Sequence, residues 1–363
     1  MGFLKRILNK REERIETYSD FWTWFRANEK AFHKAVKNNK NLEHTFFKPL
    51  SEKLADLQDG CYFLTGMADG DTAELIFTPD GIVKNVVFAE ELVRAAPIIT
   101  GWKFIALKPS VDIEKLGIEI ENYFFDKNNI FFTPVSDRNR PDEIDIDVVY
   151  KNYNVHDRSV IETGIYVFID NYLGELNVVT AIDNLELIEV PGPGEELIPI
   201  HKLKDFIIWR EKEFIEKYEG IRHHTENDTY GLLEATLDNG KPWMAIVNTT
   251  LMEWDAKASH PWILNIGITY NGSDNHGLPD TETGELMNSI EEEIMKELKD
   301  SDGYLNIVRE TGNDMREIYF ACRDFRKPSK IMNQIVKKYS SKIDLNYEIF
   351  KDKYWKSLER FSV

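Results

Sequence analysis

The hydrophobic pattern between Trp262 and Phe350 changes twice from a period of two residues to a helical period and back. A period of two is typical of a strand with one buried face, and a period of about 3.6 is typical of an amphipathic helix. The segment therefore predicts strand, helix, strand, strand, helix and strand, in that order. This order is typical of a split βαβ sandwich, the ferredoxin-like arrangement.

Two of the predicted strands show the alternation directly. Trp262 to Tyr270 and Ile343 to Phe350 place apolar residues at every second position. Helices are predicted around Glu285 to Leu298 and from Pro328 onward, where proline can begin a helix without losing a needed N–H group. Thr311-Gly312-Asn313 provides the turn between the two middle strands.

A further pair of strands precedes this unit. Tyr230 to Leu237 and Trp243 to Thr249 flank Asp238-Asn239-Gly240, which is a favoured hairpin turn. We therefore expect residues 221–363 to form a C-terminal ferredoxin-like domain, βαββαβ, with an extra N-terminal hairpin.

Prolines and glycines interrupt both periods at residues 191–194, and we place a domain boundary just after them, at residue 195. Residues 18–195 are expected to form an N-terminal α+β domain with antiparallel sheet, including a strand near Leu176 to Ala181. Residues 196–220 are expected to form a bridging helix. The predicted fold class is α+β, in two domains.

Residues 1–17 mix apolar residues at helical spacing with lysines and arginines, so we predict a basic amphipathic leader helix. Its few apolar residues give little energy for membrane insertion, although contact with an anionic membrane stays an alternative. No apolar run reaches the roughly 18 residues of a membrane-spanning helix, and the start of the chain lacks the apolar core of a secretory signal. We therefore expect a cytoplasmic protein.

The formal net charge of -18 is unevenly distributed. Residues 1–50 carry 11 basic against 6 acidic side chains, and residues 301–363 carry 13 against 9, so the acidic groups are concentrated between them. Such a charge disfavours binding to nucleic acid and favours a protein partner with a basic surface, although it also serves solubility. Cys61 and Cys322 lie far apart in apolar runs, which predicts two separate buried thiols.

Histidines and acidic residues gather at 222–228, 255–260 and 273–277 in the C-terminal half. They give one candidate polar cluster, which consists of Asp255, His260, His223, His224, Asp274 and His276. Imidazole and carboxylate groups can hold zinc, but the paired cysteines or helical histidine spacing of such sites do not occur. Ser259, His260 and Asp255 supply the residue types of a triad, but neighbours in a chain rarely point at one another. We therefore predict no catalytic residue, no metal ligand and no cofactor.

Two other patterns are interpreted as structural. Glu291, Glu292 and Glu293 are expected on the water-exposed face of their helix, since Ile290 and Ile294 mark the opposite face. The aromatic residues, which are dense near the start of the helix that contains Phe21 to Phe25, are expected in the core.

The second half of the chain resembles the bacterial family known as domain of unknown function 695. The resemblance rests on Trp209-Arg210-Glu211-Lys212-Glu213-Phe214, Ser259-His260-Pro261-Trp262, Asp302-Gly303-Tyr304-Leu305-Asn306 and Ile318-Tyr319-Phe320-Ala321-Cys322. Ala95-Ala96-Pro97, followed by Gly101-Trp102-Lys103-Phe104, resembles the region that commonly precedes that domain. The family has no established activity, so the resemblance implies no catalytic residues.

The C-terminal domain is also similar, in topology and acidity, to the ribonuclease E inhibitor family of small acidic bacterial proteins, which bind an enzyme and alter its activity. We therefore expect a non-catalytic bacterial protein that binds another protein through an acidic surface, although similarity of fold is a weak guide to function. One alternative is a hydrolase or metal-dependent enzyme that uses the His/Asp-rich loops. Another is an immunity protein that neutralises a toxin.

Overall fold

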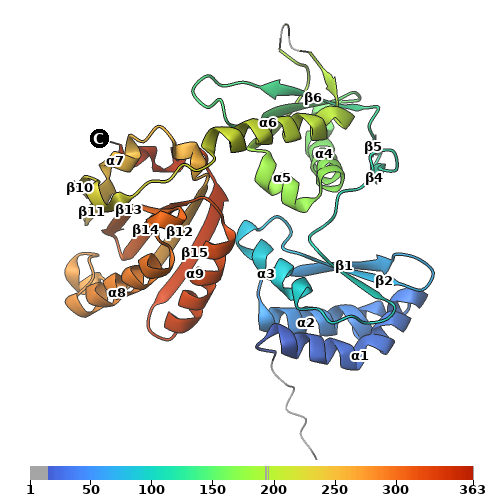
Figure 1. Cartoon of the computed structure of the whole chain (residues 1–363), viewed down its shortest axis with the longest axis horizontal. Helices are drawn as coiled ribbons and strands as arrows, with labels where there is room; N and C mark the ends of the chain where they lie inside the picture. The colour runs from blue at the N-terminus through green and yellow to red at the C-terminus, as the bar shows by residue number, and fades with distance from the viewer. Residues whose placement is uncertain (1–14, 193, 195, 363) are drawn as a thin grey trace, which may run out of the picture. The chain divides into compact units, whose positions relative to one another are not determined.

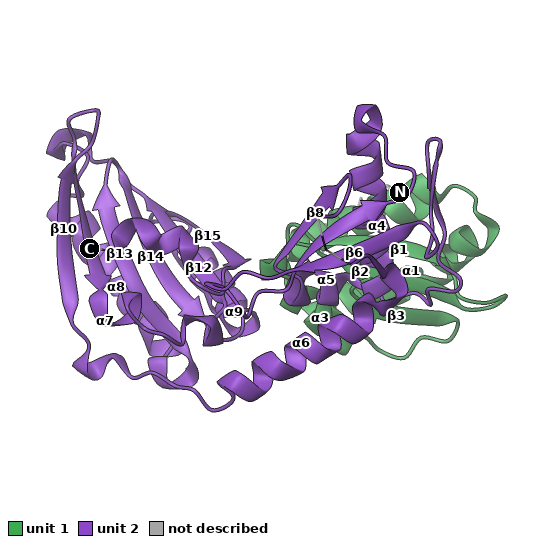
Figure 2. Ribbon diagram, turned by 90° about the horizontal axis from the view of Figure 1, so that it is seen from above, with its two compact units in different colours: residues 1–108 green, residues 109–363 purple. Residues whose placement is uncertain are grey.

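The computed structural model describes residues 15–192, 194 and 196–362, so the predicted leader of residues 1–17 lies almost wholly outside the described residues. Helices and strands are mixed along the chain, and the predicted α+β class is confirmed (Figure 1). The chain divides into two compact units, residues 1–108 and 109–363 (Figure 2). None of the described helices combines the length and the hydropathy needed to cross a membrane.

The first unit is built on a three-stranded sheet with helices packed beside it. Its elements are α1 (Tyr18–Asn38), a π-helical turn (Glu43–Phe47), α2 (Lys48–Leu57), β1 (Tyr62–Met67), β2 (Ala73–Thr78), α3 (Val83–Arg94) and β3 (Trp102–Ala106). β1 runs antiparallel to β2, whereas β2 and β3 are parallel. The prediction of an antiparallel N-terminal sheet is therefore wrong. The reason is that α3 carries the chain back between β2 and β3, and such a crossover produces parallel strands.

Aromatic side chains form the core of the first unit. Phe21, Trp22 and Phe25 of α1 are at most 3% exposed. The ring of Phe21 packs edge-on against Phe77 of β2 with centroids 6.0 Å apart, and Phe25 packs in the same way on Trp102 of β3 at 5.1 Å. The expectation that these aromatic residues serve the core is confirmed.

The second unit begins with a four-stranded sheet of order β8-β7-β6-β9. The elements of this part are β4 (Ile118–Ile120), β5 (Tyr123–Phe125), β6 (Ile130–Val135), β7 (Asp145–Tyr150), α4 (Arg158–Leu173), α5 (Glu175–Ala181), β8 (Asn184–Ile188), β9 (Ile198–Pro199) and α6 (Leu203–Tyr218). The segment Leu176 to Ala181, predicted as a strand, belongs to helix α5. Gly174, with a φ angle of +83°, ends α4 and starts α5, and the strand follows later as β8, parallel to β7.

The segment that is rich in proline and glycine connects two strands of the same sheet. β8 ends at Ile188, and β9 begins at Ile198 and pairs with β6. The sheet is thus completed after the boundary that was predicted at residue 195, and the division of the chain into two compact units falls between Lys108 and Pro109. Turn-forming residues interrupt a periodic pattern in the same way within a sheet as between domains.

The remainder of the second unit is a six-stranded antiparallel sheet of order β10-β11-β13-β14-β12-β15. Its elements are β10 (Tyr230–Thr236), β11 (Pro242–Asn248), α7 (Thr249–Met252), β12 (Trp262–Thr269), α8 (Thr281–Glu297), β13 (Tyr304–Gly312), β14 (Met315–Cys322), α9 (Arg326–Tyr339) and β15 (Asp344–Lys351). The chain order from β12 to β15 is the one that the hydrophobic periods predict. The hairpin of β10 and β11 extends the sheet beyond β13.

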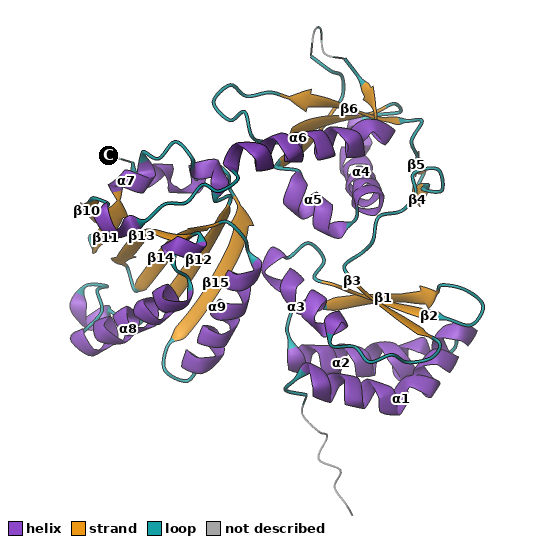
Figure 3. Ribbon diagram, viewed as in Figure 1, coloured by secondary structure: helices purple, strands orange, loops and turns teal. Residues whose placement is uncertain are grey.

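The two faces of this sheet have different covers. α8 and α9 pack on one face, where Leu264 of β12 pairs with Phe320 and Ile349 on its two sides (Figure 3). The opposite face is covered by the C-terminal segment, whose Trp355 and Leu358 are at most 1% exposed. The centre of the sheet is therefore buried on both faces.

Two helical glycines of the second unit, one in α4 and one in α8, provide a test of side-chain packing. A Cβ atom added at Gly164 would overlap the ring of Phe125, which is fully buried, whereas a Cβ atom at Gly284 of α8 would meet nothing within 4 Å. We expect Gly164→Ala to destabilise the protein by about 1–3 kcal/mol because of overpacking. We expect Gly284→Ala to stabilise it by about 0.5–1 kcal/mol, since alanine is the better helix former. Urea denaturation measures both, and equal effects would contradict the packing.

Candidate functional site

The six residues of the predicted polar cluster do not form one site. His260 lies just before β12, whereas Asp274 and His276 follow this strand in an exposed loop. β12 has eight residues, so it spans roughly 25 Å. The two groups of side chains therefore lie at opposite ends of the strand.

At the start of β12, Trp254 lies between two of the predicted histidines. The ring centroid of Trp254 is 5.2 Å from that of His223 and 5.3 Å from that of His260. The ring centroid of Trp355 lies 6.1 Å from that of Trp254. Trp355 Nε1 donates a hydrogen bond to the carbonyl oxygen of His260 at 3.0 Å. The structure thus brings His223 and His260 together in an aromatic environment.

Ser259 and His260 contact each other, against the expectation for neighbours in a chain. Ser259 Oγ donates a hydrogen bond to the carbonyl oxygen of Ala256 at 2.6 Å. Because the serine proton is used there, His260 Nδ1, which lies 2.8 Å from Ser259 Oγ, donates its own proton to the serine hydroxyl. A general base would have to accept the serine proton, and here the proton points elsewhere. Both side chains are also buried. The pair has neither the orientation nor the access of a nucleophile and its base.

His260 is a neutral, buried group. Burial, with the nearby charges of Arg323 and Arg222, lowers its pKa to about 3. Its Nε2 atom is buried and finds no hydrogen-bond partner among the residues that the structure describes. The side chain therefore costs stability whenever acid forces a proton onto it.

His223 is bound by an aspartate instead of facing a ligand. Its Nε2 lies 2.9 Å from both carboxylate oxygens of Asp228, and the same carboxylate accepts a hydrogen bond from the buried Asn248 at 2.7 Å. Asp255 and His224, the other two members of the predicted cluster, are exposed. Within residues 15–192, 194 and 196–362, no group of three His, Cys, Asp or Glu side chains is placed to hold a metal ion.

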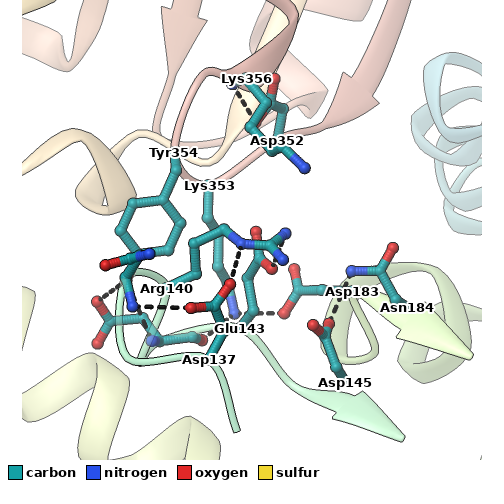
Figure 4. A network of polar contacts seen from close by, with 12 residues as sticks. Asp137, Arg140, Glu143, Asp145, Asp183, Asn184, Asp352, Lys353, Tyr354 and Lys356 are labelled. Atoms are coloured by element: carbon teal, nitrogen blue, oxygen red, sulfur yellow. Dashed lines mark hydrogen bonds and ion pairs between the residues drawn. The ribbon is translucent and has the colours of Figure 1, made fainter. Parts of the chain in front are cut away.

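A different polar cluster, the Asp183 network, joins the end of β15 to the first sheet of the second unit. Asp183 directly precedes β8, and its side chain is 8% exposed. Its two carboxylate oxygens lie 2.8 Å from Lys351 Nζ and 2.7 Å from Lys353 Nζ, and one of them accepts the amide of Ile144 at 2.7 Å. Figure 4 shows Lys353 extending toward Asp183. Two buried ammonium groups thus share one carboxylate.

Two groups of this region have pKa values shifted toward neutrality. Burial lowers the pKa of Lys351 to about 8, with a further contribution from Lys353, although Asp183 opposes the shift. Burial and the like charge of Asp145 raise the pKa of Glu143 to about 7. Perturbed groups of this kind are concentrated at functional sites, although structural ion networks produce them too.

Glu143 and Asp142 place further acids beside the lysines. Glu143 Oε2 lies 2.7 Å from Arg140 Nη1 in an ion pair that lacks hydrogen-bond geometry. Burial raises the pKa of Asp142, but hydrogen bonds from Lys217 at 2.9 Å, Tyr354 at 2.6 Å and Tyr218 at 2.7 Å together outweigh burial and lower it. This strip of charges connects the first sheet of the second unit with the C-terminal segment.

The Asp183 network cannot be recognised in the sequence because its members are far apart in the chain. Asp183 and Lys353 are separated by 170 positions. Lysine is usually exposed, so Lys351 and Lys353 read as solvated residues at the end of a strand. The pairing of β7 with β8 brings Asp183 close to Ile144, and no local pattern contains that information.

A groove lies on the helix-bearing face of the sheet, between α8 and the hairpin of β10 and β11. We call it the hairpin groove. It has a volume of about 370 Å³, and its walls include Tyr230, Ile246, Met295, Arg309 and Asp300. Tyr230 and Met295 are 56% and 47% exposed, so the walls expose large apolar surfaces.

Glu291 lies in the wall of this groove, and the prediction that it faces water is wrong. Only 7% of it is exposed. Its carboxylate lies 3.0 Å from Arg309 Nη1 and accepts a hydrogen bond from Asn306 at 3.0 Å. Glu292 is exposed as predicted. The reason is that Arg309 of β13 supplies a counter-charge on the buried side of the helix, which the helical pattern alone does not reveal.

Residues 235–361 match the model of a family of unknown function, DUF695. This part of the chain is similar to that family. The match confirms the resemblance of the C-terminal half, whereas the resemblance of residues 95–104 to a preceding region stays a prediction. No curated protein matches the chain.

The DUF695 region contains only part of each cluster. It includes His260, Lys351 and Lys353 but excludes Asp183 and His223, and it begins inside β10. The counter-charge of both buried lysines therefore comes from outside the family region. The family match also supplies no activity for the second unit.

The low pKa of His260 predicts a measurable pH dependence. The folded state keeps this imidazole neutral down to about pH 3, while the unfolded chain protonates it below its usual pKa of about 6.5. Stability is therefore lost as the pH falls from 6.5, by about 1.4 kcal/mol per unit. Between pH 6 and 4.5, the wild type should lose about 2 kcal/mol more than His260→Gln. Urea denaturation measures the difference, and the exposed His276→Gln should behave as wild type.

Asp183 provides a test of the buried network. Asp183→Asn leaves two buried lysines with a weakened partner, and we expect a loss of about 3 kcal/mol in the free energy of unfolding. The control is Asp71→Asn, which alters an ion pair of the same 2.8 Å length between Lys37 and an aspartate that is 95% exposed. Exposed pairs contribute little, so this variant should unfold like the wild type. If both variants lose the same free energy of unfolding, burial does not determine what these ion pairs contribute to stability.

Proposed function

We propose that the protein is a non-catalytic bacterial protein of the cytoplasm that binds another protein at the hairpin groove and the adjacent edge of β10. The observation that carries the proposal is an exposed apolar surface next to an edge strand. An extended segment of the partner would pair with β10 and place alternate side chains in the groove.

The backbone of β10 can accept such a strand. β10 pairs with β11, and no other described strand lies on its outer side. Edge strands present unpaired N–H and C=O groups, which proteins usually protect from uncontrolled pairing. β10 is seven residues long, which is enough for a regular ladder with a peptide.

The side chains of β10 favour an apolar partner on one face. Leu233 packs toward the buried cluster beneath Trp355. Its neighbour Leu232 points to the opposite face, where it pairs with Ile246 and is 61% exposed. Leu232 and Tyr230 thus continue the apolar wall of the hairpin groove up to the free edge. Contiguous exposed apolar surface of this kind is typical of interaction sites.

Charge favours a basic partner. α8 carries six glutamates and one lysine. Charge complementarity of this kind speeds association and selects partners more than it adds affinity. We therefore propose a partner segment that alternates apolar residues with lysine or arginine. Cytoplasmic location agrees with two cysteines that form no disulfide, of which Cys322 is fully buried.

A displayed library of random 12-residue peptides tests the proposal with the full chain as bait. We expect enrichment of peptides with apolar residues at every second position and basic residues between them. Leu232→Asp should weaken the selected peptides at least tenfold, since it places a charge in the paired face. Raising the salt concentration should slow their association.

The matched control is Ile208→Asp on α6. Ile208 is 63% exposed, so this variant makes the same kind of change on another surface and should bind the peptides as the wild type does. The proposal is wrong if Leu232→Asp and Ile208→Asp bind equally well, or if selection yields no peptide that competes for β10.

A further inference from the structure

A second cavity lies between α5 and α6 on one side and the beginning of β12 on the other. It has a volume of about 330 Å³, which is within the range of small-ligand sites. Four basic side chains line it: Arg323, Arg326, Lys351 and Lys353.

The acidic side chains beside the cavity are fewer than its four basic side chains. Arg326 pairs with Asp324 at 3.3 Å, and both lysines share Asp183. Glu211 also lines the cavity, but burial raises its pKa, which disfavours its charged form. At least one positive charge at the wall therefore lacks a neighbouring counter-charge.

Arg323 is the basic residue of this wall that has no acidic partner in the described part of the chain. Among the described residues, no acceptor for its guanidinium group lies within hydrogen-bond or ion-pair distance, although its backbone amide donates to Gly303. Burial and the like charge of Arg222 lower its pKa. An arginine presents a planar set of donors that suits a carboxylate or phosphate group.

The rest of the wall is apolar and aromatic. Trp262 and Phe325 pack edge-to-face with centroids 4.7 Å apart. Phe214 and Ile215 of α6 complete this side, and Lys353 Nζ lies 4.8 Å from the centre of the Phe214 ring. A ligand with an apolar body could bury that body here while its charged end contacts the cations.

We propose that this cavity binds a small organic anion. Arg323 and Lys351 hold the carboxylate or similar oxyanion group of the ligand, and its apolar body packs on Phe214, Trp262 and Phe325. Lys351 Nζ already contacts Asp183 and the carbonyl oxygen of Ala181 at 3.1 Å, so one of its three donors is available. The ligand supplies the negative charge that the wall lacks.

Calorimetric titration of the full chain with phenylacetate, hexanoate and phenyl phosphate tests this proposal. We expect at least one of them to bind with a Kd below about 1 mM, and phenylacetamide, the neutral counterpart of phenylacetate, to bind at least tenfold more weakly. Methyl NMR should place the largest changes at Ile144 and Ile215, which line the cavity. Absence of binding by all three anions at 20 mM, or equal binding of phenylacetamide, overturns the proposal.

Two variants separate the site from general charge effects. Arg323→Gln should weaken binding about tenfold, because it removes one charge-assisted hydrogen bond. Arg26→Gln, at an exposed position of α1, makes the same change elsewhere and should bind as the wild type does. Ile215→Trp, at a side chain that is 62% exposed, should obstruct the cavity without altering any charge. Unchanged binding in both Arg323→Gln and Ile215→Trp also overturns the proposal.

Discussion

The Asp183 carboxylate is the contact on which the arrangement of the second unit depends. It binds Lys351, Lys353 and the amide of Ile144, and all of these contacts are buried or nearly so. A buried ammonium group without a counter-charge is costly, so the end of β15 has to lie where this carboxylate is. That position in turn fixes the start of the C-terminal segment, whose Trp355 covers one face of the six-stranded sheet.

Both proposed binding sites arise where this arrangement leaves something uncompensated. Two lysines share one carboxylate, and Arg323 beside them has no acceptor among the described residues, so positive charge remains at the cavity wall. At the opposite edge of the six-stranded sheet, the hairpin of β10 and β11 extends beyond the surface that α8 covers, so Leu232 and Tyr230 stay exposed. Unsatisfied charge and unsatisfied apolar surface favour different ligands, which is why we assign a small anion to one place and a protein segment to the other.

The sequence predicted well where local periodicity determines structure. The alternation from Trp262 onward identified β12, and the proline at position 328 marked the start of α9 within two residues. It failed at residues 176–181, where β-branched residues favoured a strand but Gly174 allowed a second helix. It also failed for the parallel pairs in the first two sheets, because strand direction depends on the connection and not on the strand itself.

The candidate site was harder to predict than the fold. Six histidines and acids were grouped by their proximity in the sequence, yet the structure brought only His223 and His260 together and left Asp274 and His276 at the far end of β12. Glu143 and Lys351, whose pKa values are strongly shifted, belong to patterns that are typical of solvated residues in a sequence. Burial of a charge depends on tertiary contacts, and those of Lys351 come from a residue 168 positions away.

The family match begins at residue 235, whereas the edge strand β10 begins at Tyr230, and Asp183 lies further upstream in the chain. A fragment cut to these limits would contain Lys351 and Lys353 without Asp183, which supplies their counter-charge. It would also lack most of β10. The family region is thus shorter than the part of the chain that supplies the counter-charge of its two buried lysines.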